Sequence, residues 1–231
     1  HEVGDVARAL YSARHGDGPT LEYEGGLGKA LAATKRLLAD PGDKRPVYEA
    51  TFQYQGILVR LDVRLREPSG IRLIEVKAST SLKPEHISDC AIQAWVARGA
   101  GVVFKTMSLA HVDNRFVYPG GGDYQGLLLE HDITSEVMAL QDEVPRWLAS
   151  AQAVVVGRTE PDVQPGKRCV TPYDCAFMAH CWPAGTAYPV QALGGDRELL
   201  GTFVSAGYRD LRDVPDDRLT LTDGTALLWG I

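Results

Sequence analysis

Two regions near the start of the chain carry hydrophobic residues at helical spacing, which predicts an amphipathic helix in each. The second region covers residues 27–39, and the pair Pro41 and Gly42 after it is a helix stop signal. A loop rich in glycine separates the two regions. The hydrophobic positions of the first helix are Val3, Val6, Ala7, Leu10 and Tyr11.

The hydrophobic spacing then changes to alternation, which is typical of strands with one buried face. Leu61, Val63 and Leu65 alternate with charged residues, and a run of Ile, Leu and Val follows a turn at residues 68–70. The pattern predicts three strands, over residues 47–54, 57–66 and 71–77.

Helix and strand patterns alternate again in the following part of the chain. A helix is predicted from about Pro84, where a missing N–H does no harm, to Gly99. The later predictions are strands over 102–113 and 127–130 and a helix from Thr134 to about Val155, kinked or restarted at Pro145. The order α-α-β-β-β-α-β-β-α predicts an α/β fold in which helices flank a mixed sheet.

The C-terminal third has a different composition. Residues 161–189 contain five prolines and three cysteines with little regular period, so we expect this segment to need a cross-link to hold its shape. The pattern divides the chain into a core over residues 1–158, a Cys/Pro-rich segment over 159–190 and a tail over 191–231. The tail, with a weak helix near residues 198–208, could be the start of a further domain.

Composition and charge narrow the class of protein. A chain of 231 residues can form one substantial domain, and its net charge of -6 argues against coating nucleic acid by bulk charge. No apolar run reaches the roughly 18 residues of a membrane span and no signal peptide is evident, so we expect a cytoplasmic protein without a membrane partner. The chain begins at His1 inside a predicted helix, and we therefore expect a fragment.

The strands over 57–77 carry the charged residues with the clearest chemistry. Glu75 and Lys77 lie one pleat apart on the same face, and Asp62 on the preceding strand can reach the same point. Two carboxylates can hold Mg²⁺ or Mn²⁺, which acidifies a water, and a lysine can orient that water or stabilise charge on a phosphate. The simpler alternative is a surface salt bridge beside the sheet edge.

Arginines are also frequent on these strands. Arg60, Arg64, Arg66 and Arg72 could line a groove that follows phosphates, or they could form an ordinary solvated face. The pattern alone leaves both readings open.

The residues together resemble a known family. Asp62, a turn, Glu75-Val-Lys77, a helix bearing Gln93 and a late cysteine group resemble the PD-(D/E)XK nucleases, specifically their RecB-like and Cas4-like branch. The segments HISDCAIQAWVARGAG and CVTPYDCAFMAHC are similar to the bacterial proteins grouped as DUF2779. The resemblance covers roughly residues 1–185, and it implies a restriction-endonuclease-like sheet with a cysteine-bearing C-terminal extension.

The resemblance also implies roles for individual residues. Asp62 and Glu75 would bind the metal, with His1 and the carbonyl of Val76 as further ligands, and Lys77 would act on the attacking water. Gln93 matches the glutamine of the family's helix motif, although Ala97 stands where that motif usually has a tyrosine. Glu49 matches a position that is often acidic in related nucleases, and a purely structural role is equally compatible with it.

Cys169, Cys175 and Cys181 are separated by five residues each. A zinc site with His180 as fourth ligand is one reading and reduced thiols in a loop is another, but zinc sites usually use tighter pairs. The resemblance implies a [4Fe–4S] cluster held by these three cysteines and one earlier cysteine. That earlier cysteine has no counterpart here, since Cys90 falls on the apolar side of a predicted helix.

These observations predict a divalent-metal-dependent DNA nuclease, acting as an exonuclease or on single strands. The partner would be DNA, the cofactor Mg²⁺ or Mn²⁺, and an iron–sulfur cluster or Zn²⁺ could occupy the cysteine segment of the full-length protein. The alternative is a catalytically silent nucleic-acid-binding or assembly module of the same fold.

Overall fold

The computed structural model describes residues 2–21, 25–40, 42–163, 167–181, 187–190, 197–215 and 218. The chain forms two compact units, His1–Val156 and Gly157–Ile231. Within the described ranges, no helix has the length and apolar character needed to cross a membrane. The predicted subdivision of the C-terminal part at residue 190 stays a prediction.

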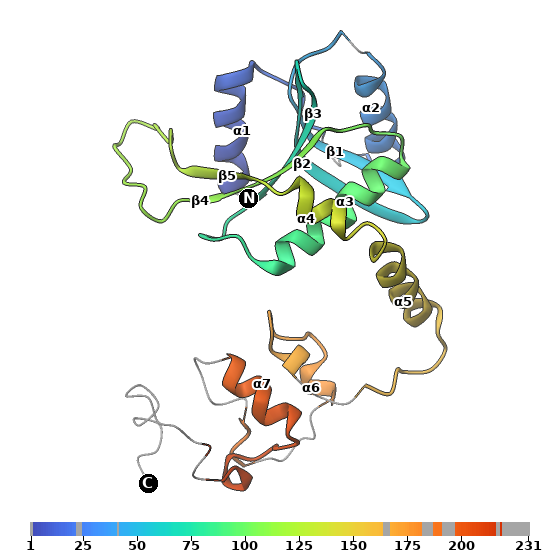
Figure 1. The fold of residues 1–231 in the computed structure, drawn as a ribbon, viewed down its shortest axis with the longest axis vertical. Helices are drawn as coiled ribbons and strands as arrows, with labels where there is room; N and C mark the ends of the chain where they lie inside the picture. The colour runs from blue at the N-terminus through green and yellow to red at the C-terminus, as the bar shows by residue number, and fades with distance from the viewer. Residues whose placement is uncertain are drawn as a thin grey trace. The chain divides into compact units, whose positions relative to one another are not determined.

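Five strands of the first unit form one mixed sheet in the order β1-β2-β3-β4-β5 (Figure 1). Neighbouring strands are antiparallel except for β3 and β4, which are parallel. Parallel neighbours need a crossover, and helix α3 (Pro84–Gly99) supplies it. The strands are β1 (Val47–Tyr54), β2 (Ile57–Glu67), β3 (Gly70–Lys77), β4 (Thr106–Val112) and β5 (Leu128–Asp132).

Helices cover both faces of this sheet, as expected for a layered α/β unit. On one face, α1 (Glu2–His15) packs Ala7 and Tyr11 against a cluster that includes Val63 and Ile74. On the other face, α2 (Leu27–Ala39) and α3 enclose the larger core, which α4 (Thr134–Ala139) and α5 (Val144–Val156) complete. The predicted α/β class, with a mixed sheet flanked by helices, is confirmed.

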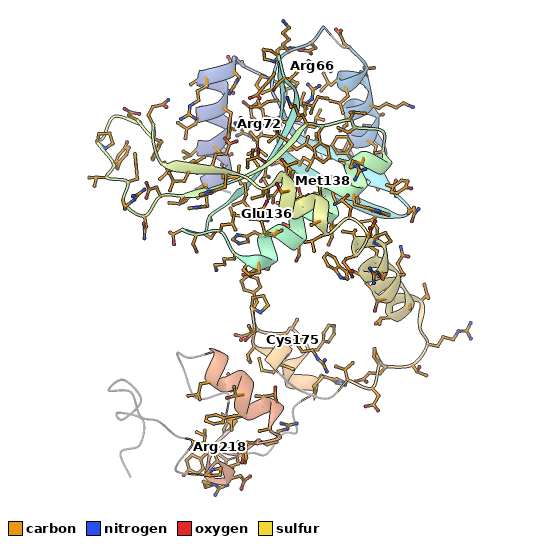
Figure 2. All side chains as sticks on the ribbon, in the orientation of Figure 1. Arg66, Arg72, Glu136, Met138, Cys175 and Arg218 are labelled. Atoms are coloured by element: carbon orange, nitrogen blue, oxygen red, sulfur yellow. The ribbon has the colours of Figure 1, made fainter. Side chains whose placement is uncertain are left out.

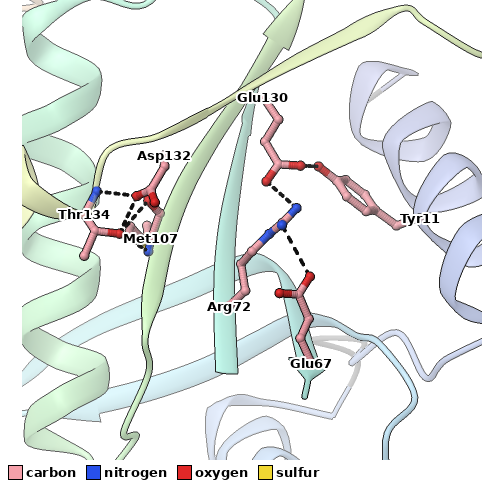
Figure 3. A network of polar contacts seen from close by, with 7 residues as sticks. All are labelled: Tyr11, Glu67, Arg72, Met107, Glu130, Asp132 and Thr134. Atoms are coloured by element: carbon pink, nitrogen blue, oxygen red, sulfur yellow. Dashed lines mark hydrogen bonds and ion pairs between the residues drawn. The ribbon is translucent and has the colours of Figure 1, made fainter. Parts of the chain in front are cut away.

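A polar network fixes α1 to the sheet (Figure 3). The Tyr11 hydroxyl donates a hydrogen bond to Glu130 Oε2 at 2.9 Å, and Arg72 Nη2 lies 2.6 Å from Glu130 Oε1. Arg72 also reaches Glu67 Oε1 at 3.3 Å. The network therefore joins α1 to β5, to β3 and to the end of β2, and it holds α1 beside the strands that carry the candidate site.

One predicted strand differs from the one observed. The strand expected over 102–113 begins only at Thr106, because the Val102 N–H is taken by the carbonyl of Ala97 at the end of α3. The helix expected from Thr134 to about Val155 restarts near Pro145, as predicted, because α5 begins at Val144 and residues 140–143 separate it from α4. In that interval the buried Gln141 amide donates to the carbonyls of Ala91 and Val137, at 3.1 and 3.0 Å.

The second unit contains shorter elements. Its helices are α6 (Met178–Cys181) and α7 (Arg197–Ser205), with 3-10 turns η1 (Lys167–Cys169) and η3 (Leu211–Asp213). A small apolar cluster holds them together. Its buried members are Cys169, Val170, Val190, Leu200, Phe203, Val204 and Val214.

Candidate active site

The site begins where β2 and β3 separate. Their antiparallel pairing ends at Val63 and Ile74, although β2 extends back to Ile57 and β3 forward to Lys77. Beyond that pair, Asp62 Oδ2 accepts a hydrogen bond from the backbone N–H of Val76 at 2.7 Å. A carboxylate thus replaces the missing backbone acceptor, and it is held at the gap between the strands.

Glu75 and Lys77 lie on the neighbouring strand and face α3. Glu75 is 6% exposed, and its Oε1 accepts a hydrogen bond from Lys77 Nζ at 2.7 Å. Its second oxygen, Oε2, is buried and has no hydrogen-bond partner among the described residues. Lys77 Nζ also donates to Asp89 Oδ2 on α3 at 2.5 Å. The structure therefore joins Glu75 and Lys77 directly, and it places the Asp62 carboxylate near enough for its charge to act on Glu75.

Helix α3 contributes a polar stripe to this face. His86, Asp89 and Gln93 recur at helical spacing of three and four residues, so they lie on one side of the helix. Gln93 is 6% exposed and its Oε1 has no partner among the described residues, while its amide lies near Glu75. The sequence analysis did not predict Asp89 or His86 as site residues. Their helical spacing from Gln93 is the sequence feature that points to them.

The two carboxyl groups have raised pKa values. Burial raises the pKa of Asp62 to about 6, with Glu49 adding to the rise and the Val76 N–H and Lys77 opposing it. Burial, followed by the charge of Asp62, raises the pKa of Glu75 to about 7, against the opposing effect of Lys77. The positive charge of Lys77 therefore does not offset the burial of the two carboxyl groups. A bound cation would stabilise their ionised forms.

The donor set suits a hard divalent cation. Mg²⁺ commonly binds through one or two carboxylates and keeps several waters, so Asp62 and Glu75 would supply enough protein ligands. The unpartnered Glu75 Oε2 is an available oxygen donor. No group of three or more His, Cys, Asp or Glu placed to hold a metal is found in the part of the chain that the structure describes. His1, the predicted further ligand, lies outside the described residues, and the Val76 carbonyl stays a predicted ligand.

A cavity of about 240 Å³ gives access to Asp62 from the side of α1. Glu49 lines it together with Asp62 and Val76, and Arg60 Nη2 lies 3.1 Å from Glu49 Oε2. Glu49 has a φ of 58°, a left-handed conformation that is unusual for a residue within a strand. The remaining lining residues are Val3, Gly4, Asp5, Ala7, Arg8, Tyr48, Val63 and Ala78.

The left-handed backbone at Glu49 interrupts the alternation of β1. Tyr48 packs on the α1 side, whereas Ala50 packs in the core on the opposite side. Tyr48 and Ala50 pair with Val63 and Leu61, but no such pair is formed by Glu49. The irregularity therefore lies directly opposite Asp62, and backbone strain of this kind often accompanies functional positions.

The second unit carries the three cysteines of the predicted iron–sulfur or zinc site. Cys169 is buried in η1, and its carbonyl accepts the Cys175 N–H at 2.8 Å. Cys181 is exposed at the end of α6, and His180 Nε2 contacts Glu160 Oε1 at 2.7 Å. Because these side chains do not form a metal-binding group among the described residues, a [4Fe–4S] cluster or Zn²⁺ here stays a prediction.

Comparisons with known proteins do not assign the chain to a family. No family model matches the chain, and no curated protein matches it. The protein SSO0001, known from a crystal structure, aligns with 68% of this chain and 82% of its own chain, at 15% sequence identity and a TM-score of 0.24. A likeness at that level carries no argument about fold or function, so the family resemblance stays a proposal.

Proposed function

We propose that the protein is a divalent-metal-dependent DNA nuclease with a restriction-endonuclease-like core, in the RecB-like and Cas4-like branch of the PD-(D/E)XK nucleases. One observation carries the proposal. Asp62 and Glu75 are two buried carboxylates with raised pKa values at the split between β2 and β3, and Lys77 is bonded to Glu75. A structural ion pair does not need a second buried acid beside it.

Each residue has a distinct role in this proposal. Asp62 and Glu75 would hold Mg²⁺ or Mn²⁺, with His1 and the carbonyl of Val76 as the additional ligands that the resemblance implies. The bound ion would lower the pKa of a water and neutralise charge on the phosphate. Asp62 is oriented by its bond to the Val76 N–H, so its second oxygen is the one free to bind.

Lys77 would serve as a charged hydrogen-bond donor rather than as a base. Burial acts to lower its pKa, but Glu75 and Asp89 together raise it, so the ammonium keeps its proton at neutral pH. A protonated lysine can orient the attacking water and stabilise negative charge on the phosphate. Gln93 would position Glu75 through its nearby amide.

The substrate would be DNA, either single-stranded or at its ends, as the family resemblance implies. The rival proposal is a nucleic-acid-binding or assembly module of the same fold without activity. The paired acids favour the enzyme, because a module that only binds has no need for two buried carboxylates that destabilise the fold without a cation.

A cleavage assay separates the two proposals. Single- and double-stranded DNA would be incubated with Mn²⁺ or Mg²⁺ and with the wild type, Glu75→Ala or Lys77→Ala. We expect cleavage by the wild type that needs the metal and is lost in both variants. DNA binding without cleavage would support the rival, and equal cleavage by the variants would exclude this site as the active one.

For the C-terminal extension, we propose a [4Fe–4S] cluster on Cys169, Cys175 and Cys181. Protein purified without oxygen should be brown and contain iron and sulfide. A colourless protein that contains zinc would support the zinc alternative and overturn the cluster.

A further inference from the structure

Among the charged residues of the first unit that the structure describes, the one with the lowest exposed fraction lies outside the candidate active site. Arg64 on β2 is only 1% exposed, and its Nε and Nη2 atoms have no hydrogen-bond partner among the described residues. The solvated-face reading of the strand arginines is therefore wrong for Arg64. A guanidinium buried in this way is costly unless an anion balances it.

Arg66 adds to this positive charge. Arg64 and Arg66 pair in regular register with β3, so their side chains share the face opposite Val63 and Leu65, which pack on the α1 side. The Nε atom of Arg66 is also buried without a partner in the described part of the chain. Burial, followed by the repulsion of Arg66, lowers the pKa of Arg64 to about 10.

Nearby acids do not neutralise the pair. The Asp43 charge partly opposes the lowering of the Arg64 pKa. However, Arg45 donates to both Asp43 carboxylate oxygens, from Nη2 at 2.8 Å and from Nε at 3.1 Å. Glu67, next to Arg66 in sequence, is engaged by Arg72. The positive charge at this end of the sheet therefore exceeds the available negative charge.

Arg66 lies at the end of the sheet where β2 turns into β3 (Figure 2). An open cavity lies beside it. It measures about 580 Å³, and Lys44 from the α2–β1 connection lines it together with Arg66. The side chain of Lys105, a third cation, lies against the turn at Gly70. The other lining residues are Glu67, Pro68, Ser69, Gly70, Ile71 and Val103.

We propose that this cavity binds a phosphate group through Arg66 and Lys44, with Lys105 beside the Gly70 turn and the buried Arg64 adding positive charge nearby. Arginine and lysine are the usual protein partners of phosphate, and the guanidinium can bind it through two parallel hydrogen bonds. Arg66 is four residues from Asp62, which corresponds to roughly 13 Å along a strand. The site is therefore separate from the candidate active site, and the proposal does not depend on the nuclease function.

The phosphate could be a free anion or part of a nucleic-acid backbone, and a binding experiment distinguishes the two sources. Inorganic phosphate and a short single-stranded oligonucleotide would be titrated separately into the wild type, at constant ionic strength with chloride as the reference anion. The matched variants are Arg66→Gln and Arg64→Met, and the control is Arg115→Gln, because Arg115 is an exposed arginine paired locally with Asp113.

We expect phosphate to raise the melting temperature more than chloride does, and Arg66→Gln to weaken phosphate binding by about tenfold or more. Arg64→Met should weaken binding while leaving the phosphate-free protein as stable as the wild type or more so. If the source is a nucleic acid, the oligonucleotide will compete with phosphate and lose affinity in Arg66→Gln. The proposal is overturned if phosphate acts no differently from chloride, or if Arg66→Gln and Arg115→Gln bind equally well.

Discussion

The Asp62 carboxylate accepts a hydrogen bond from the Val76 N–H at 2.7 Å, directly after the last backbone pair between β2 and β3. This contact occupies one carboxylate oxygen and fixes the other at the opening between the strands. It therefore links the irregularity of the sheet to the chemistry of the site, because the group that completes the sheet is also the predicted metal ligand.

The two roles of Asp62 can be separated by substitution. Asp62→Asn keeps an oxygen that can accept from Val76, whereas Asp62→Ala leaves that N–H without its partner. We expect Asp62→Ala to be less stable than Asp62→Asn by about 1–2 kcal/mol in urea unfolding. Both variants should lose metal-dependent cleavage. Equal stability of the two would show that the contact with Val76 contributes nothing to the fold.

The raised pKa values predict how stability changes with pH in the absence of metal. Asp62 and Glu75 have ordinary pKa values of 3.8 and 4.5 and folded values of about 6 and about 7. Between about pH 4 and pH 7 the folded state binds more protons than the unfolded state, so stability falls as pH rises. Since one pKa unit corresponds to about 1.4 kcal/mol, the loss is on the order of 3 kcal/mol for each of the two carboxyl groups.

This pH effect can be measured by unfolding in a chelator. Glu75→Gln should remove about half of the decline, because it removes one of the two titrating groups whose pKa values are raised by similar amounts. Added Mn²⁺ should reverse the decline above pH 6, since an ion binds the deprotonated carboxylates. A wild-type stability that rises steadily from pH 4 to pH 7 in chelator would contradict the assignment.

The Lys77 contacts predict unequal effects of two substitutions. Lys77→Ala removes the cation from Glu75 and should lower kcat/KM by about 100-fold or more. Asp89→Asn retains an acceptor for Lys77, so its loss should stay below about tenfold. Lys35→Ala, at an exposed position on α2, is the control. A larger loss in Asp89→Asn than in Lys77→Ala would assign the main role to Asp89.

The Tyr11–Glu130 hydrogen bond predicts a contribution to stability alone. Tyr11→Phe removes the donor to Glu130 Oε2 but leaves the Arg72 contact, so unfolding should become easier by about 1 kcal/mol. Tyr124→Phe, at a partly exposed position, should change stability little. An unchanged unfolding free energy in Tyr11→Phe would show that the network does not hold α1.

Much of the first unit follows from its sequence pattern. The alternation around Leu61 and Val63 predicts β2, and the turn before Ile71 predicts its pairing with β3. The contact between Glu75 and Lys77 could be predicted, because residues two apart on a strand share one face.

Other features depend on tertiary contacts that no local pattern encodes. The left-handed backbone of Glu49 and the contact of Asp62 with Val76 arise from the separation of two strands. In the sequence, Arg64 is one of several charged residues that alternate with hydrophobic ones. Only the folded structure shows that its side chain is buried. Asp89 was identifiable only once α3 was known to face β3.

The metal site of Asp62 and Glu75 can be tested by Mn²⁺ binding to the wild type, Asp62→Asn and Glu75→Gln, followed by electron paramagnetic resonance at pH 7.5. We expect saturable binding by the wild type that is lost in both variants, while Glu67→Gln, at the remote end of β2, should bind as the wild type does. Wild-type protein that binds no Mn²⁺, or variants that bind it unchanged, would contradict a metal site formed by Asp62 and Glu75.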